Sequence, residues 1–262
     1  MSAVRFSQYI GIDYSGAGRD DQGQANIQCC CWKHMADGCE NARSPAGRNW
    51  SRQAVCEWIT DRLATAEGPV IIGLDHGFSY PLSYLQQQDI DCWDALLEHI
   101  FRLHNESERP SLHGAGQSVG PNHPLRLAEM WTVSAKSVLW YGGKGQVGPA
   151  TRAGIAQLYR LRQGLRRQGI KTHFWPFDGW SVPAGSYVIC EAYPAIYKRR
   201  YEQVAPAEFS KAANPDLFDA YCVARWLKER DEAGLLEYYF TPPLTPEEKA
   251  QARLEGWILG VC

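Results

Sequence analysis

The stretch YIGIDYSGA, residues 9–17, decides the fold that we predict for this chain. A short apolar run with β-branched residues, bounded by small and turn-forming residues, is typical of a buried β-strand. This run ends in a carboxylate, Asp13, and the small residues 15–17 that follow would let a ligand approach the backbone closely. Residues 70–75 (VIIGLD) repeat the pattern and end in Asp75. Ligands of α/β sheets bind outside the carboxyl ends of strands, so the two acids together predict a functional site.

The composition is typical of a globular protein, and it excludes some classes of function. The chain has 262 residues, of which 45% are hydrophobic and 21% charged, with a formal net charge of −2. That charge excludes a protein that coats nucleic acid through a basic surface on every side, although a local basic groove remains compatible with it. Apolar runs are too short to cross a bilayer, and no signal peptide is recognisable. We therefore expect a cytoplasmic protein without a membrane partner; the sequence indicates no oligomeric state.

Nine cysteines are present, and residues 29–31 form a run of three. None of them has C-x-x-C spacing, so we expect reduced thiols that behave as small hydrophobic side chains, with the run inside a strand. A zinc site formed by Cys31, His34 and Cys39 is a lower-ranked alternative, because these spacings match no known ligand pattern.

The first half of the chain predicts an antiparallel meander followed by a parallel strand. Turn signals at residues 18–23 and 37–38 separate the first strand from expected strands at 25–32 and 39–42. Residues 50–63 then change to helical periodicity. A helix that joins two strands of one sheet makes those strands parallel, so Asp13 and Asp75 should lie at the same edge.

Residues 81–170 predict an insertion within one domain that covers residues 1–262, since no stretch resembles an interdomain linker. Helices are expected at 93–103 and 151–168, and a glycine-rich loop that carries Lys144 lies between them.

Two later elements also bring acids to the predicted edge. A strand over residues 187–191 ends in Glu191, and a weaker strand is expected at 172–175. Asn214 followed by proline is a strong helix start, and this helix carries Asp216 and Asp219 on one side of its first turns.

These carboxylates form the candidate site. Two carboxylates about 4 Å apart repel each other by roughly 4 kcal/mol at an effective dielectric constant of 20, so a cluster must bind protons or cations. Oxygen ligands favour Mg²⁺ or Mn²⁺ over zinc, and such ions can activate water for phosphodiester hydrolysis. Each acid alone also has an ordinary explanation as a turn residue or a helix cap, and Asp216 is explained most easily in that way. The predicted metal ligands are Asp13, Asp75, Glu191, Asp216 and Asp219.

The order of these elements resembles the ribonuclease H-like fold, and the helix that carries DLFDA (216–220) resembles the closing helix of its Holliday-junction resolvase branch. A closer resemblance is to an uncharacterised family described as predicted nucleases of that fold, and it extends over most of the chain. It is carried by GID (11–13), GLD (73–75), GQVG (145–148), EAYP (191–194), DA (219–220) and EGWI (255–258). The resemblance implies a mixed α/β sheet flanked by helices, metal-dependent hydrolysis of nucleic acid, and Asp13, Asp75, Glu191 and Asp219 as catalytic ligands.

Several other residues are candidates for substrate contact: Ser15, His76, Lys144, Lys198 and Arg199. A nuclease needs cations for phosphates, although a solvated surface is the usual explanation of such charges. His76 would serve either as a proton shuttle or as a packed, hydrogen-bonded side chain, and Ser15 would bind a phosphate or cap its turn.

Two other functions stay open. The first glycine-containing turn also resembles the phosphate loop of sugar kinases and actin-like ATPases, which would make the protein a phosphotransferase. Alternatively, the chain keeps the fold without catalysis and binds a partner through its tryptophan-rich surface.

Overall fold

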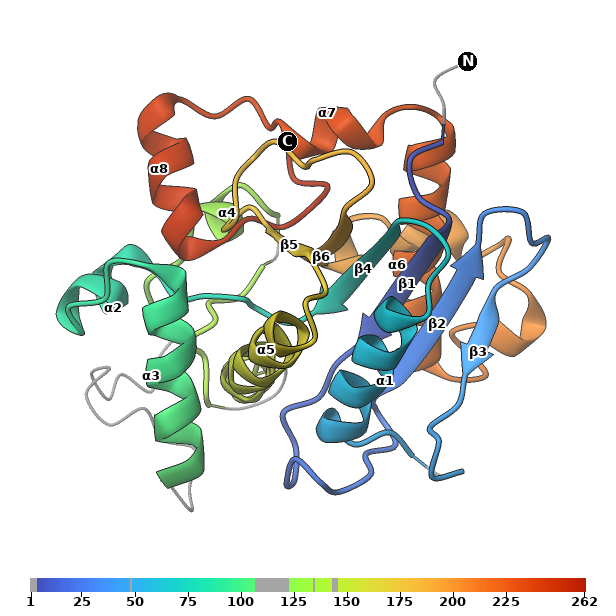
Figure 1. The fold of residues 1–262 in the computed structure, drawn as a ribbon, viewed down its shortest axis with the longest axis horizontal. Helices are drawn as coiled ribbons and strands as arrows, with labels where there is room; N and C mark the ends of the chain where they lie inside the picture. Colours follow the sequence, from blue (N-terminus) through green and yellow to red (C-terminus); the bar gives the residue numbers. More distant parts are fainter. Residues whose placement is uncertain (1–3, 48, 107–122, 134, 143–145) are drawn as a thin grey trace.

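The computed structural model describes residues 4–47, 49–106, 123–133, 135–142 and 146–262. The chain is an α/β protein with a six-stranded mixed sheet in the order β3-β2-β1-β4-β6-β5 (Figure 1). The strands are β1 (Gln8–Asp13), β2 (Gln28–Lys33), β3 (Glu40–Ala42), β4 (Val70–Asp75), β5 (Thr172–Trp175) and β6 (Tyr187–Glu191).

Helices connect and cover these strands. They are α1 (Arg52–Ala64), α2 (Leu82–Gln87), α3 (Trp93–Glu106), α4 (Leu127–Met130), α5 (Gly148–Arg167), α6 (Pro215–Glu232), α7 (Leu236–Phe240) and α8 (Pro246–Glu255). Three short 3₁₀ helices lie between β6 and α6: η1 (Pro194–Ile196), η2 (Lys198–Tyr201) and η3 (Ala207–Phe209). No helix among the described residues is long and apolar enough to cross a membrane.

The predicted meander and crossover are confirmed. Strands β1, β2 and β3 pair antiparallel, and the run of three cysteines lies inside β2. Helix α1, which the Ser51 side chain caps, returns the chain so that β4 pairs parallel with β1. In this register Asp13 is the partner of Asp75. The strand at 172–175 also forms, but β6 lies between it and β4, so β5 is the edge strand.

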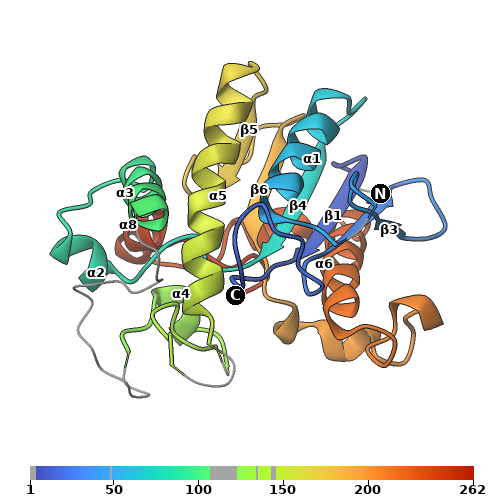
Figure 2. The same cartoon turned by 90° about the horizontal axis from the view of Figure 1, so that it is seen from below.

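Helices cover both faces of the sheet. Helices α1 and α5 lie on one face and α6 lies on the other (Figure 2). Side chains alternate between the two faces of a strand, so Ile72 and Leu74 of β4 pack toward α1 and α5, whereas Ile71 packs with α6. The side of α5 predicted to face inward is buried, and it completes the first of these cores. Helix α5 is thus part of the core, although it lies within the stretch expected as an insertion.

Helix α6 packs unusually close to the sheet because two glycines lie beneath it. Gly11 of β1 and Gly73 of β4 are partners in the sheet. A Cβ atom on Gly11 would lie 2.1 Å from the Ala220 carbonyl oxygen, and one on Gly73 would lie 2.6 Å from Cγ1 of Val223. No other residue type fits at Gly11 without moving the helix backbone. The sequence pattern GID thus lets α6 approach the strand ends that carry the acids.

We expect Gly11→Ala to destabilise the fold by at least about 2 kcal/mol, because the added methyl group overpacks a contact between two backbones. The control is Gly164→Ala in α5, where a Cβ atom meets nothing within 4 Å. That change should raise the free energy of unfolding by about 0.5–1 kcal/mol, since alanine is the better helix former. Urea denaturation of both variants measures the difference. Equal stabilities would show that α6 does not depend on this close approach.

Candidate metal centre

Three aspartates meet at one edge of the sheet. Asp13 and Asp75 are the last residues of adjacent parallel strands, and Asp219 lies in the second turn of α6. One carboxylate oxygen from each of the three lies within 4.8 Å of the others. Among the described residues this is the only group of three or more histidine, cysteine, aspartate or glutamate side chains placed to hold a metal ion. The structure therefore brings together three of the five acids predicted from the sequence.

The start of α6 sets the position of Asp219. The Asn214 side chain accepts hydrogen bonds from the backbone N–H groups of Asp216 and Leu217, and Pro215 occupies the first turn. The helix therefore begins at a defined residue, and Asp219 follows just before Ala220, whose carbonyl lies over Gly11. Asp216 is close enough to raise the pKa of Asp13, but it is not one of the three clustered acids.

The three carboxylates resist ionisation. Burial, followed by repulsion from Asp75, Asp216 and Asp219, raises the pKa of Asp13 well above its ordinary value. Burial, followed by the charge of Asp219, raises the pKa of Asp75 to about 7, although Lys198 opposes this shift. Burial also raises the pKa of Asp219. The cluster therefore has an excess of negative charge when it is ionised, which is the property expected of a cation site.

Lys198 neutralises part of this charge. Its Nζ atom, on η2, lies 2.6 and 3.0 Å from the two carboxylate oxygens of Asp219. The sequence predicts Lys198 as a phosphate contact, but here it is the counterion of a clustered acid. Arg199, the other predicted contact on η2, is exposed to solvent.

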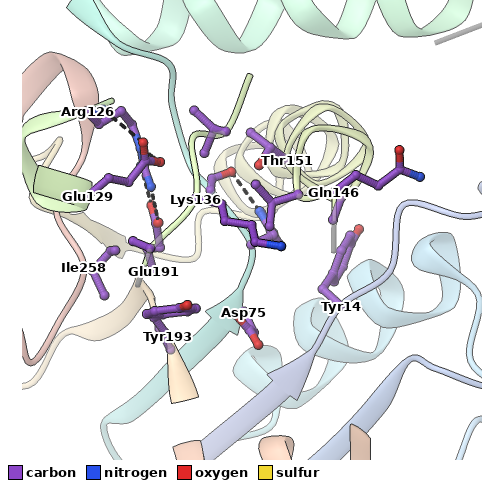
Figure 3. Close-up of a pocket in the computed structure, with 17 residues that line it drawn as sticks. Tyr14, Asp75, Arg126, Glu129, Lys136, Gln146, Thr151, Glu191, Tyr193 and Ile258 are labelled. Carbon is purple, nitrogen blue, oxygen red and sulfur yellow. Dashed lines mark hydrogen bonds and ion pairs between the residues drawn. The ribbon is translucent and has the colours of Figure 1, made fainter. Parts of the chain in front are cut away.

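Glu191 does not join the aspartates, because its side chain faces the other side of the sheet. In the parallel pairing of β4 with β6, Glu191 is the partner of Leu74, not of Asp75. Neighbouring residues of a strand point to opposite faces, so this offset of one residue separates Glu191 from Asp75. Glu191 is buried and receives hydrogen bonds from both terminal nitrogens of Arg126 at 2.5 and 2.8 Å and from the Phe78 amide at 3.0 Å (Figure 3).

Arg126 is the centre of a buried network of hydrogen bonds with acidic residues, and no sequence pattern indicates this network. Its Nε atom donates to Glu129 at 2.9 Å, and its Nη1 atom donates to the backbone carbonyl of Glu255. The Glu255 carboxylate in turn accepts a hydrogen bond from the Leu127 amide at 2.7 Å. Ile258, in the EGWI motif, forms a bridge with Glu191. This network holds the last segment of the chain against β6.

The other predicted contacts have structural partners. The Ser15 hydroxyl accepts a hydrogen bond from the Ala17 amide and so caps its turn. His76 is buried between the rings of Tyr14 and Phe78, and burial lowers its pKa to about 4, which keeps it neutral at pH 7. Of the two roles predicted for His76 from the sequence, a proton shuttle or a packed side chain, the structure therefore agrees with the packed side chain. Lys144 lies outside the described residues.

We expect Asp75→Asn to stabilise the metal-free protein above pH 7 and to leave it almost unchanged near pH 4. The folded pKa of about 7 exceeds the ordinary value of 3.8, so the folded state holds a proton that the unfolded state has lost between these pH values. Stability therefore falls as pH rises through this window and is lowest above it. The gain in the variant at pH 8 should reach up to about 4 kcal/mol. Urea denaturation in EDTA at pH 4, 6 and 8 measures it, and a pH-independent difference would contradict the shift.

Arg126→Met should destabilise the fold by about 3 kcal/mol or more, because it leaves the buried carboxylates of Glu129 and Glu191 without their cation. The matched control is Arg102→Met, which removes an exposed arginine 3.4 Å from Glu98 on α3. The control should change stability by less than about 0.5 kcal/mol. Similar losses in the two variants would show that the buried network has no special role.

Comparison with protein-family models, with curated proteins and with solved structures gave no match to this chain.

Proposed function

We propose that this protein is a divalent-metal-dependent hydrolase that cleaves phosphodiester bonds of DNA or RNA, built on a ribonuclease H-like fold. The observation that carries the proposal is the meeting of Asp13, Asp75 and Asp219 within 4.8 Å of one another. The order of strand, meander, crossover helix, strand and closing acidic helix supports the fold assignment. The expected location in the cytoplasm stays a prediction.

The donor set fits Mg²⁺ or Mn²⁺. All three side chains offer carboxylate oxygen, the ligand that these ions prefer, and no thiol or imidazole belongs to the group. Burial is the largest cause of the raised pKa values of the three acids, and repulsion between the carboxylates adds to it at Asp13 and Asp75. A bound cation would balance these charges and would remove the free-energy cost of ionising them together.

Within this proposal the residues have distinct roles. Asp13, Asp75 and Asp219 would hold the ion, which supplies Lewis acidity and lowers the pKa of water for attack on phosphorus. Lys198 would exchange its partner: while Asp219 binds the ion, the ammonium group becomes available to a phosphate oxygen. Glu191 would act indirectly, because its bonds to Arg126 and to the Phe78 amide fix the segment that follows β4.

The turn that follows β1 does not support the phosphotransferase alternative. A Cβ atom on Gly16 would lie 2.2 Å from the carbonyl carbon of Pro149 at the start of α5. This glycine therefore allows close packing between two chain segments, and it does not leave the turn open to a phosphate. The metal-binding and cleavage experiments described below distinguish the hydrolase from the other alternative, a non-catalytic binding protein.

We expect Mn²⁺ to bind the parent protein and Asp13→Asn to weaken that binding by at least about tenfold, or 1.4 kcal/mol. An Asp13→Asn/Asp75→Asn double variant should bind no Mn²⁺ that calorimetry detects. Glu191→Gln is the matched control: it also neutralises a buried acid at a strand end, and it should leave Mn²⁺ affinity within about twofold, or 0.4 kcal/mol.

Cleavage is tested with single-stranded, duplex, hybrid and branched substrates in Mg²⁺ and Mn²⁺. The parent protein should cleave at least one of these substrates, and Asp13→Asn should lower the cleavage rate by about 10²-fold or more. Metal binding without cleavage of any substrate would count against hydrolysis of nucleic acid, whereas the binding-protein alternative predicts that no metal binds. Absence of metal binding would overturn the proposal.

A further inference from the structure

A cavity adjoins the aspartate cluster on the side of the sheet that α5 covers. Its volume is about 370 Å³, within the range of about 300–1,000 Å³ that is usual for small-molecule sites. Asp75 lines this cavity and also belongs to the cluster. Ala150 and Thr151, from the first turn of α5, line it as well. A molecule held at the aspartates can therefore extend into the cavity on the α5 side.

The lining of the cavity is largely charged, and the two cations among its described lining residues differ in their access to solvent. Arg126 is buried, and its hydrogen bonds to Glu129 and Glu191 engage its guanidinium group within the wall. Lys136 also lines the cavity, but it is exposed. A lysine carries a compact charge on a flexible stem, so the ammonium group of Lys136 can reach a ligand that enters from solvent.

The backbone that carries Lys136 is held in place by the next residue. The Ser137 hydroxyl donates a hydrogen bond to the Pro124 carbonyl at 2.6 Å and accepts one from the Leu139 amide at 3.1 Å. Ser137, Val138 and Leu139 are all buried. The Lys136 side chain therefore starts from a fixed point of the fold, although the side chain itself is exposed.

The side chain of Lys136 is directed toward the aspartate cluster. Figure 3 shows it reaching into the space between Asp75 and Tyr14. Its Nζ atom lies 5.6 Å from the centroid of the Trp140 ring, a cation–π contact that restrains the stem. Such a contact is weak at an exposed site, so a phosphate group, which carries a full negative charge, can compete for the ammonium group.

Lys136 and Lys198 approach the cluster from opposite faces of the sheet. Lys198 lies on η2, which packs with α6, and it pairs with Asp219. Lys136 lines the cavity beside α5, on the face opposite α6 (Figure 2). A strand of nucleic acid that crosses the ends of β1 and β4 would therefore meet one lysine on each side of the aspartates.

We propose that Lys136 binds a phosphate group of the nucleic acid strand on the α5 side of the aspartate cluster, opposite Lys198. The inference rests on the proposed function and names the path of its substrate: the strand crosses the sheet edge from η2 toward the cavity. The contact is with the sugar–phosphate backbone, so it carries no preference for base sequence. Lys136 is then a substrate-binding residue and takes no part in holding the ion.

Lys136→Met tests the contact directly, because it removes the ammonium group and keeps an unbranched stem. The probe is single-stranded DNA or RNA of mixed sequence, whichever the parent binds more tightly, in Ca²⁺, an ion that also takes carboxylate oxygen ligands. A series of otherwise identical strands carries one neutral methylphosphonate in place of successive phosphates. At one position the parent should lose affinity by at least about threefold, whereas Lys136→Met should lose almost none there, because its contact is already absent. The variant should also show a shallower salt dependence of affinity, by about 0.7 in the logarithmic slope.

Lys33→Met is the matched control. Lys33 is also an exposed lysine, but it is the partner of Gln8 at the start of β1, at the opposite end of the strand from Asp13. This variant should keep the parent's response to every methylphosphonate. Lys136→Arg, which keeps the charge, should keep the response that Lys136→Met loses. An identical profile in the parent and in Lys136→Met, or equal changes in Lys136→Met and Lys33→Met, would overturn the inference.

Calorimetry with Mn²⁺ separates this inference from the metal centre. Lys136→Met should bind Mn²⁺ within about twofold of the parent, because an ammonium group is not a metal ligand. Mn²⁺ binding with an unchanged methylphosphonate profile, or a parent that binds no strand, would refute the Lys136 contact alone. Loss of the response in Lys136→Met, in a protein whose parent form binds no Mn²⁺, would support the phosphate contact and refute the metal centre.

Discussion

The close contact between α6 and the paired glycines Gly11 and Gly73 is the constraint on which the site depends. A helix normally stands off a sheet by the length of its side chains. Here the Ala220 carbonyl occupies the space of a missing side chain on β1, so the helix lies near the sheet backbone. Asp219 precedes Ala220 in the chain and is thereby brought to the ends of β1 and β4. The glycines thus determine both the packing of the core and the geometry of the acid cluster.

The alternation of side chains along the strands divides the buried acids into two sites of different character. On the α6 side, Asp13 and Asp75 share one lysine with Asp219 and keep raised pKa values. On the α5 side, Glu191 accepts hydrogen bonds from both terminal nitrogens of Arg126 and from the Phe78 backbone amide. A carboxylate that is already satisfied gains little from a metal ion, whereas unsatisfied ones gain a great deal. The structure therefore distinguishes a carboxylate whose charge is balanced by an arginine from a cluster of three carboxylates of which only Asp219 pairs with a lysine.

The sequence predicts the features that depend on short stretches of chain. The strands that end in Asp13 and Asp75, the helix between them and the capped start of α6 follow from local patterns, and together they place three acids correctly. The position of Glu191 depends on the alignment of β6 with β4 to within one residue, and no local pattern contains that alignment. The role of Arg126 cannot be predicted for a related reason: Glu191, which it binds through both terminal nitrogens, is 65 residues away in the chain. The order of β5 and β6 is likewise a long-range property.

The energetics of the site suggest why Lys198 is present. Without a cation, three clustered carboxylates would favour either protonation or separation, and separation would disturb the approach of α6. A lysine on η2 that pairs with Asp219 lowers this cost while leaving Asp13 and Asp75 with raised pKa values. An arginine there would bind the carboxylate in a fixed bidentate geometry, as Arg126 binds Glu191, and would compete more strongly with an ion. A lysine is a compact charge on a flexible stem, so it can leave the carboxylate with little rearrangement. The two counterions therefore match the two roles under the proposed function: a fixed one where the acid is structural, and an exchangeable one where the acid would bind an ion.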